Sequence, residues 1–320
     1  MRAFPRPRLL ISACLEFRKV RYDGKSVPCG IVRQLMPYAD FLLVCPEYEI
    51  GLGVPRDPIR LVMAGGEHRM VQPKTGRDVT GEIDAFTDRF LATLPEVDGF
   101  IFKSKSPTIG VSDIKVYQDA HSPIVVEKAS GLFARKILAK YPDYPVEEDE
   151  RLNNAIIRYR FLTRVFAFAG LREAGASKSE GRMEAFHEDN QLLYLLYDPV
   201  LCQRLEEAHE TGDYDIYADS FRELFTRAPD RQSYIRVMEH LLGLAGDRPD
   251  DTEQRLFRDA LDKYGRDELC LEGLLEIAWL LASRCGPGLE RQTIFEPFPP
   301  GLMVGAASER SKKSYRRASR

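Results

Sequence analysis

The chain has 320 residues, of which 44% are hydrophobic and 30% are charged, and its formal net charge is −3. That length allows two globular domains with hydrophobic cores, and the small net charge excludes a general electrostatic attraction to nucleic acid or to an anionic membrane. No stretch has the length of a membrane span, and the apolar run near the start is too short for a signal peptide. We therefore expect a cytoplasmic protein with reduced cysteines, and the lack of a CxxC pair argues against a zinc ribbon.

The first half of the chain alternates apolar runs of strand length with helical patterns. The apolar runs lie at residues 8–13, 41–44, 59–63 and 99–102, and the helical patterns lie at residues 30–36, 81–94 and 131–140. This alternation predicts a mainly parallel, Rossmann-like α/β sheet domain over residues 1–145.

The second half of the chain follows a different pattern. Residues 141–150 are rich in proline and acidic residues and read as a linker or as the capped start of a helix. Beyond them, apolar residues recur at helical spacing, so we expect an all-α domain over residues 150–303. Residues 304–320 are basic and serine-rich and predict a disordered tail, with a tail that contacts RNA or lipid as the alternative.

Two of the predicted strands run directly into a cysteine, at Cys14 and Cys45. Ligands of open α/β sheets bind at the carboxyl ends of the strands. Two thiols at that edge could bind a soft metal or an iron–sulfur cluster, or could carry out thiol chemistry. The alternative is that both are buried as small hydrophobic side chains, which is the usual environment of a free cysteine.

Several long motifs, in order along the chain, resemble known families. The first half resembles the 2-thiouracil desulfurase-like domain of bacteria. The strings that carry this resemblance are, in chain order, SACLEF, VRYDG, VCPEYEIGLGVPRDPIRLV and VDGFIFKSKSP. FHEDNQLLYLLY and QTIFEPFP resemble the YbgA-type helical domain that is often fused to it. The resemblance covers about residues 8–303 and implies a desulfurase that acts on a thiolated pyrimidine or a related thionucleobase and releases hydrosulfide.

The resemblance also implies a cofactor, a four-iron four-sulfur (4Fe-4S) cluster held by three cysteines with one iron open to sulfur. The first two ligands fall on Cys14 and Cys45. The third belongs in a Ser-Pro-Ser-Cys-Gly motif, and the corresponding position in this chain is Ile109. Isoleucine has no lone pair to donate to iron, so this substitution puts the cluster in question.

Cys29 is the other thiol of the first half and could replace the missing ligand. It lies between a proline and a glycine at the start of a predicted helix, and a helix N-terminus lowers the pKa of a thiol. The alternative is a surface cysteine without a role.

The resemblance further assigns side chains around the expected pocket. Glu47 is the candidate acid/base, with the capping of a backbone turn as its alternative role. Ser106 is the candidate to position the base, although a serine before proline is also an ordinary turn residue.

Four more residues are candidates to bind substrate. Arg21, Tyr22 and Asp23 match a family motif, although Asp23-Gly24 alone would be a turn signal. Lys103 could hold an anion, but a lysine at a strand end is more often solvated. We also expect Arg56 to pair with the adjacent Asp57 and thereby to fix its loop.

Two functions remain open. One is the iron–sulfur desulfurase, and the other is a repurposed, cluster-free binding or interaction protein, which Ile109 favours. The helical domain could cover the pocket, form a homodimer or recruit a partner. His187 in this domain is expected to be a structural histidine, because a metal site needs several convergent ligands and the spacing shows no HExxH-like pair.

Overall fold

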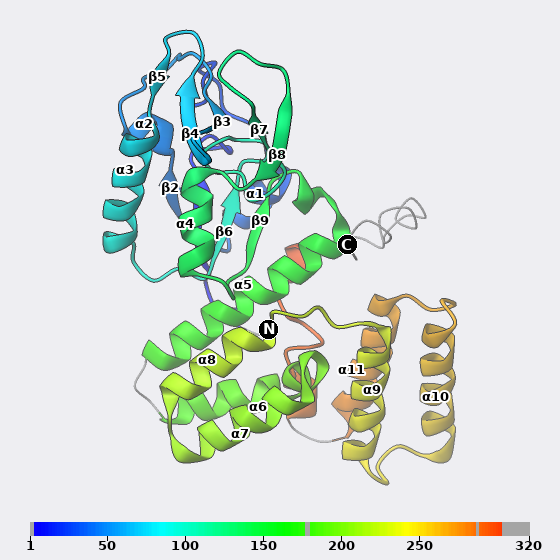
Figure 1. Cartoon of the computed structure of the whole chain (residues 1–320). Helices are drawn as coiled ribbons and strands as arrows, with labels where there is room; N and C mark the ends of the chain where they lie inside the picture. Colours follow the sequence, from blue (N-terminus) through cyan, green and yellow to red (C-terminus); the bar gives the residue numbers. More distant parts are fainter. Residues whose placement is uncertain (1–2, 177–179, 286–287, 303–320) are drawn as a thin grey trace. The chain divides into compact units, whose positions relative to one another are not determined.

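A computed structural model describes residues 3–176, 180–285 and 288–302 of the chain (Figure 1). These residues divide into an α/β unit, Arg6–Phe161, and a helical unit that begins at Leu162 and includes the N-terminal residues up to Pro5. The predicted fold class, a mainly parallel α/β region followed by an all-α region, is confirmed. The predicted basic tail lies outside the described residues.

The first sheet of the α/β unit contains only parallel strand pairs. Its spatial order is β2 (Asp40–Val44), β1 (Arg8–Ser12), β6 (Gly99–Phe102) and β9 (Val146–Glu148). The central strands β1 and β6 are almost entirely buried, as expected for a parallel sheet whose two faces are covered.

Helices pack against the first sheet through a hydrophobic core that includes several aromatic side chains. The α/β unit contains α1 (Gly30–Leu35), α2 (Pro46–Glu49), α3 (Thr80–Thr93), α4 (Leu132–Lys140) and the 3-10 turn η1 (Arg151–Asn153). Figure 1 shows α3 and α4 next to each other, and Phe86, Phe90 and Phe133 pack between these helices and β6.

A second, mostly antiparallel sheet was not predicted. Its spatial order is β5 (Arg77–Asp78), β4 (Glu67–Gln72), β3 (Arg60–Ala64), β7 (Ile114–Tyr117) and β8 (Val125–Ala129). The apolar run expected in the parallel sheet at residues 59–63 instead forms β3, which pairs antiparallel with β4. Gly65 and Gly66, at φ of 61° and 81°, form the two-residue turn between them, and such hairpin turns require positive φ.

The acidic segment read as a linker is part of the first sheet, so that interpretation is wrong. β9 pairs with β6 from Phe100↔Val146 to Phe102↔Glu148. The adjacent Asp149 is only 7% exposed and accepts hydrogen bonds from the loop that follows β6. Glu148 is likewise 7% exposed and accepts the backbone N–H of Val111, so these two acidic residues have partners that are distant in the sequence.

The helical unit has the predicted all-α character. Its helices are α5 (Ala155–Ala176), α6 (Glu180–Tyr197), α7 (Pro199–Thr211), α8 (Tyr214–Leu224), α9 (Arg231–Ala245), α10 (Asp251–Gly265) and α11 (Leu271–Arg284). The boundary between the two units falls within α5. Two 3-10 turns follow, η2 (Leu289–Arg291) and η3 (Pro300–Leu302). Aspartate side chains cap the N-termini of α7 to α10 by accepting backbone N–H bonds, which fixes where these helices begin. Among the described helices, none has the length and apolar character needed to span a membrane.

Gly131 is the point where the loop after β6 packs against the start of α4. The carbonyl of Thr108 accepts the backbone N–H groups of Phe133 and Ala134 at 2.9 and 3.3 Å, and thereby caps this helix. A Cβ on Gly131 would lie 2.5 Å from both the carbonyl carbon and the oxygen of Thr108.

We therefore expect Gly131→Ala to destabilise the protein by about 1–3 kcal/mol, because the capping carbonyl would have to move. Urea denaturation followed by circular dichroism measures this loss. Gly81→Ala is the matched control, because no atom lies within 4 Å of its added Cβ in α3 and alanine favours a helix. Equal stability of the two variants would contradict the close packing.

Candidate functional site

Two half-buried cysteines leave the first sheet at the same edge. β1 and β2 pair up to Ser12↔Val44, and the backbone N–H of Ala13 then donates to Val44 O at 2.8 Å. Cys14 follows on one strand, and on the other Cys45 is the N-cap residue of α2. The two side chains lie close enough that the charge of a Cys45 thiolate would raise the pKa of Cys14.

Burial keeps both thiols protonated in the metal-free protein. Loss of solvation raises the pKa of Cys14 to about 12, and Cys45, Glu47 and Asp149 contribute in the same direction. The pKa of Cys45 is also raised, mainly by burial and then by Glu47, although the Arg56 guanidinium opposes this shift.

Glu47 lies in α2 and is held by a buried ion pair. Its Oε2 accepts hydrogen bonds from Arg56 Nη2 and Nε at 2.5 and 3.0 Å, and its Oε1 accepts one from Thr108 Oγ1 at 2.9 Å. The side chains of Arg56 and Glu47 are 4% and 13% exposed. Arg56 Nη2 also lies 3.9 Å from Cys45 Sγ, so one guanidinium positions both the carboxylate and the thiol.

The expected ion pair between Arg56 and Asp57 is therefore wrong. Asp57 instead pairs with Lys74 at 3.2 Å, near the surface. Arg56 additionally donates to the carbonyl oxygens of Val20 and Gly53 at 2.9 and 3.1 Å. Adjacent opposite charges suggested a local pair, whereas the loop directs the two side chains to different partners.

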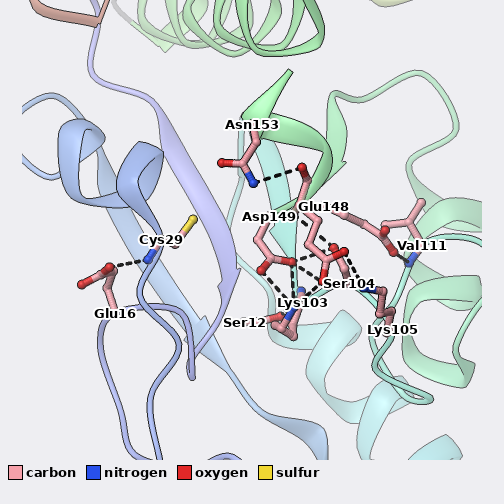
Figure 2. A network of polar contacts seen from close by, with 11 residues as sticks. Ser12, Glu16, Cys29, Lys103, Ser104, Lys105, Val111, Glu148, Asp149 and Asn153 are labelled. Atoms are coloured by element: carbon pink, nitrogen blue, oxygen red, sulfur yellow. Dashed lines mark hydrogen bonds and ion pairs between the residues drawn. The ribbon is translucent and has the colours of Figure 1, made fainter. Parts of the chain in front are cut away.

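Lys103 belongs to a polar network around Asp149, shown in Figure 2. Its Nζ lies 2.9 and 3.1 Å from the two carboxylate oxygens of Asp149, and Ser104 donates to the same carboxylate through both N–H and Oγ at 2.7 Å. The backbone N–H of Lys103 donates to Ser12 Oγ at 2.9 Å. Lys103 also lies close enough to lower the pKa of Cys14, so its charge acts on the site although an internal carboxylate already pairs with it.

Ser106 has the turn role that was its alternative interpretation. Its Oγ accepts the backbone N–H groups of Thr108 and Ile109 at 3.4 and 3.3 Å. Ile109 is 4% exposed and belongs to an apolar cluster that includes Phe102 and Phe133. The residue at the position of the family's third ligand is therefore an apolar side chain of the core in this chain.

Arg21, Tyr22 and Asp23 form a turn at the surface. Arg21 pairs with Asp23 at 2.8 Å, and its guanidinium lies 4.7 Å from the centre of the Tyr22 ring. The carbonyl of Tyr22 accepts the backbone N–H of Arg56 at 2.8 Å. This turn is thus connected through the backbone to the residue that holds Glu47.

Cys29 is buried at the start of α1 rather than exposed. Its backbone N–H donates to the Glu16 side chain, as Figure 2 shows. The expectation of a lowered pKa is wrong, because burial raises the pKa of Cys29 more than the N–H groups of the short helix lower it. A backbone bond of 2.7 Å from the N–H of Val27 to the carbonyl of Cys14 brings the loop of Cys29 beside the turn after β1.

The helical unit contains a buried network around His187. Its Nδ1 lies 3.2 Å from Tyr217 Oη, which in turn lies 2.7 Å from Tyr194 Oη, and its Nε2 lies 2.8 Å from Glu206 Oε2. The ring stacks on His209 at a centroid distance of 4.2 Å. Both ring nitrogens of His187 have partners, in agreement with a structural histidine, but the sequence held no signal for its stacking on His209.

Comparisons with known proteins match a family model to a part of each half of the chain. Residues 9–149 match the family model described as 2-thiouracil desulfurase, and residues 191–299 match a family described as protein of unknown function (DUF1722). The chain joins a 2-thiouracil desulfurase-like domain to a YbgA-like DUF1722 domain. The uncharacterized protein YbbK of Bacillus subtilis (strain 168) is 26% identical over 155 residues, which are 46% of this chain and 99% of YbbK. No solved structure matches.

The desulfurase-like domain does not fit the cluster that its family implies. The described residues contain no group of three His, Cys, Asp or Glu side chains that could hold a metal ion. Cys14 and Cys45 supply two ligands, but Ile109 lies in the apolar core and Cys29 does not complete such a group. A three-cysteine cluster therefore lacks a ligand in this chain.

The buried ion pair should contribute strongly to stability. Arg56→Met leaves the Glu47 carboxylate with Thr108 as its remaining partner, and we expect a loss of about 3–5 kcal/mol in urea denaturation. The double variant Glu47→Gln/Arg56→Met should recover part of this loss, because it leaves no unpaired charge. The matched control is Arg77→Met, since Arg77 and Glu82 form an exposed pair worth about 1 kcal/mol or less. Equal losses in Arg56→Met and Arg77→Met would contradict this role.

The raised pKa of Cys14 predicts slow alkylation of the metal-free protein. With a pKa of about 12, on the order of one Cys14 in 10,000 is a thiolate at pH 8. Iodoacetamide labelling quantified by peptide mass spectrometry should show a Cys14 rate that rises tenfold per pH unit up to pH 10, while the exposed Cys270 reacts rapidly. A plateau in the Cys14 rate near pH 8 would contradict the shift.

Proposed function

We propose that the α/β unit is a desulfurase that acts on a thiolated pyrimidine or a related thionucleobase and releases hydrosulfide. The observation that carries this proposal is the gathering of Cys14, Cys45 and Glu47 at the carboxyl edge of the first sheet, where α/β sheets bind ligands. The family match of residues 9–149 supports the reaction class.

The reaction exchanges sulfur for oxygen without a change in oxidation state. A thiocarbonyl and water give a carbonyl, hydrosulfide and a proton, so the site must handle sulfur and move protons. Glu47 is the proposed acid/base, because its carboxylate adjoins the thiol edge and Arg56 and Thr108 hold it in place.

The substrate would be oriented by the loop after β6 and by the surface turn. Lys103 provides a positive charge beside Cys14, and Ser106 begins the turn that presents the Thr108 hydroxyl to Glu47. The turn of Arg21 to Asp23 offers a cation, a ring and a carboxylate on the solvent side. These groups match a flat base with hydrogen-bonding edges.

A cluster-free binding or interaction protein is the second candidate function. The burial of Ile109 at the family's third ligand position supports it. Such a protein would retain the fold and the two thiols at the sheet edge but would not release hydrosulfide.

Restoring the third cysteine tests the role of this position. After anaerobic reconstitution, we expect wild type to hold about one iron per chain or fewer and Ile109→Cys to approach about four, with a corresponding rise in hydrosulfide release from 2-thiouracil. Ile109→Ala is the matched control, since it also removes side-chain volume from the core but adds no ligand. Full and stable loading of wild type would mean that the ligand assignment is wrong.

A second comparison separates the two candidate functions. Glu47→Gln should abolish hydrosulfide release in both the wild-type and the Ile109→Cys background, while iron content stays unchanged. If wild type releases no hydrosulfide from 2-thiouracil or 4-thiouracil, the desulfurase proposal fails for this chain and the binding function replaces it, whether or not Ile109→Cys is active.

A further inference from the structure

The carboxyl edge of the first sheet presents two thiols, and within the part of the chain that the structure describes no third side chain completes a metal-binding group with them. Cys14 and Cys45 follow adjacent parallel strands, and their side chains interact electrostatically. A structural zinc site needs four ligands, and an iron–sulfur cluster takes cysteine at most of its corners. A monovalent d¹⁰ cation accepts two thiolates in a linear arrangement, and thiolates select Cu(I) among biological metals.

The charges at this edge suit a single monovalent cation. The ion pairs Arg56–Glu47 and Lys103–Asp149 each combine one positive and one negative side chain, and all four groups act electrostatically on Cys14 or Cys45. Two thiolates with one monovalent cation leave a charge of only −1. The Arg56 guanidinium, 3.9 Å from Cys45 Sγ, stabilises that remaining charge.

The backbone holds both cysteines in place before any ion binds. The carbonyl of Cys45 accepts the N–H groups of Tyr48 and Glu49, each at 3.0 Å, and the carbonyl of Cys14 accepts that of Val27 at 2.7 Å. Both side chains are partly exposed, so an ion can reach them from solvent. A preorganised pair loses little entropy on binding.

We propose that Cys14 and Cys45 form a two-thiolate centre that binds one Cu(I) ion at the edge where the family's cluster is expected. The binding does not depend on desulfurase activity. A role of the ion in desulfuration, in which it would accept the sulfur of a thiocarbonyl group, does rest on the proposed function.

The test is an anaerobic Cu(I) titration of the full-length, reduced protein in competition with bathocuproine disulfonate. Cys202, Cys270 and Cys285 are first changed to serine, so that the remaining thiols are those of the α/β unit. We expect one Cu(I) per chain and a two-sulfur shell in X-ray absorption. Cys14→Ser and Cys45→Ser should each weaken binding by about 100-fold or more, because each removes half of the ligand set.

Cys29→Ser is the matched control and should bind Cu(I) like its parent. Far-UV circular dichroism checks that each variant folds, and Cys14→Ala and Cys45→Ala provide alternatives if a buried serine is not tolerated. Unchanged Cu(I) affinity in the Cys14 and Cys45 variants would overturn the proposal. So would a three-sulfur shell that Cys29→Ser reduces, or a stable four-iron cluster in wild type.

Separate measurements distinguish this proposal from the proposed function. Intact Cu(I) binding without hydrosulfide release from 2-thiouracil, with or without the ion, would count against the desulfurase alone. Hydrosulfide release from a protein that binds no Cu(I) would count against the metal centre alone.

Discussion

A single buried carboxylate organises the candidate site. Asp149, at the end of β9, binds Lys103 and both donors of Ser104, and so it fixes the start of the loop that follows β6. That loop then delivers Thr108, whose hydroxyl reaches Glu47 and whose carbonyl caps α4. A buried charge is costly unless it is fully paired, so Asp149 strongly favours this one conformation of the loop.

The site combines two thiols with two internally neutralised ion pairs. Arg56 lowers the pKa of Cys45 and Lys103 lowers that of Cys14, but the carboxylates paired with these cations act in the opposite direction. Burial therefore dominates and keeps Cys14 and Cys45 protonated in the metal-free protein. Ligands that bind sulfur must displace these protons, which couples binding at this edge to pH.

The loop that carries Ile109 keeps its conformation for reasons unrelated to a metal ligand. Gly110 and Gly131 allow close approach of the backbone, since a Cβ on either would lie within 2.8 Å of a carbonyl oxygen. Ser106 closes the turn, and Ile109 itself adds to the apolar core. The fold can therefore tolerate loss of the ligand, because packing and hydrogen bonds hold the loop.

The sequence by itself determined the strands β1, β2 and β6, the flanking helices and the arrival of Cys14 and Cys45 at one sheet edge. These features follow from local periodicity and from the rule that parallel strands end together. The tertiary structure alone decided the second sheet, the strand role of β9, the partner of Arg56 and the surroundings of Ile109 and Cys29. Each of these depends on which distant segments pair and on how deeply a side chain is buried, and local sequence patterns carry no information about either.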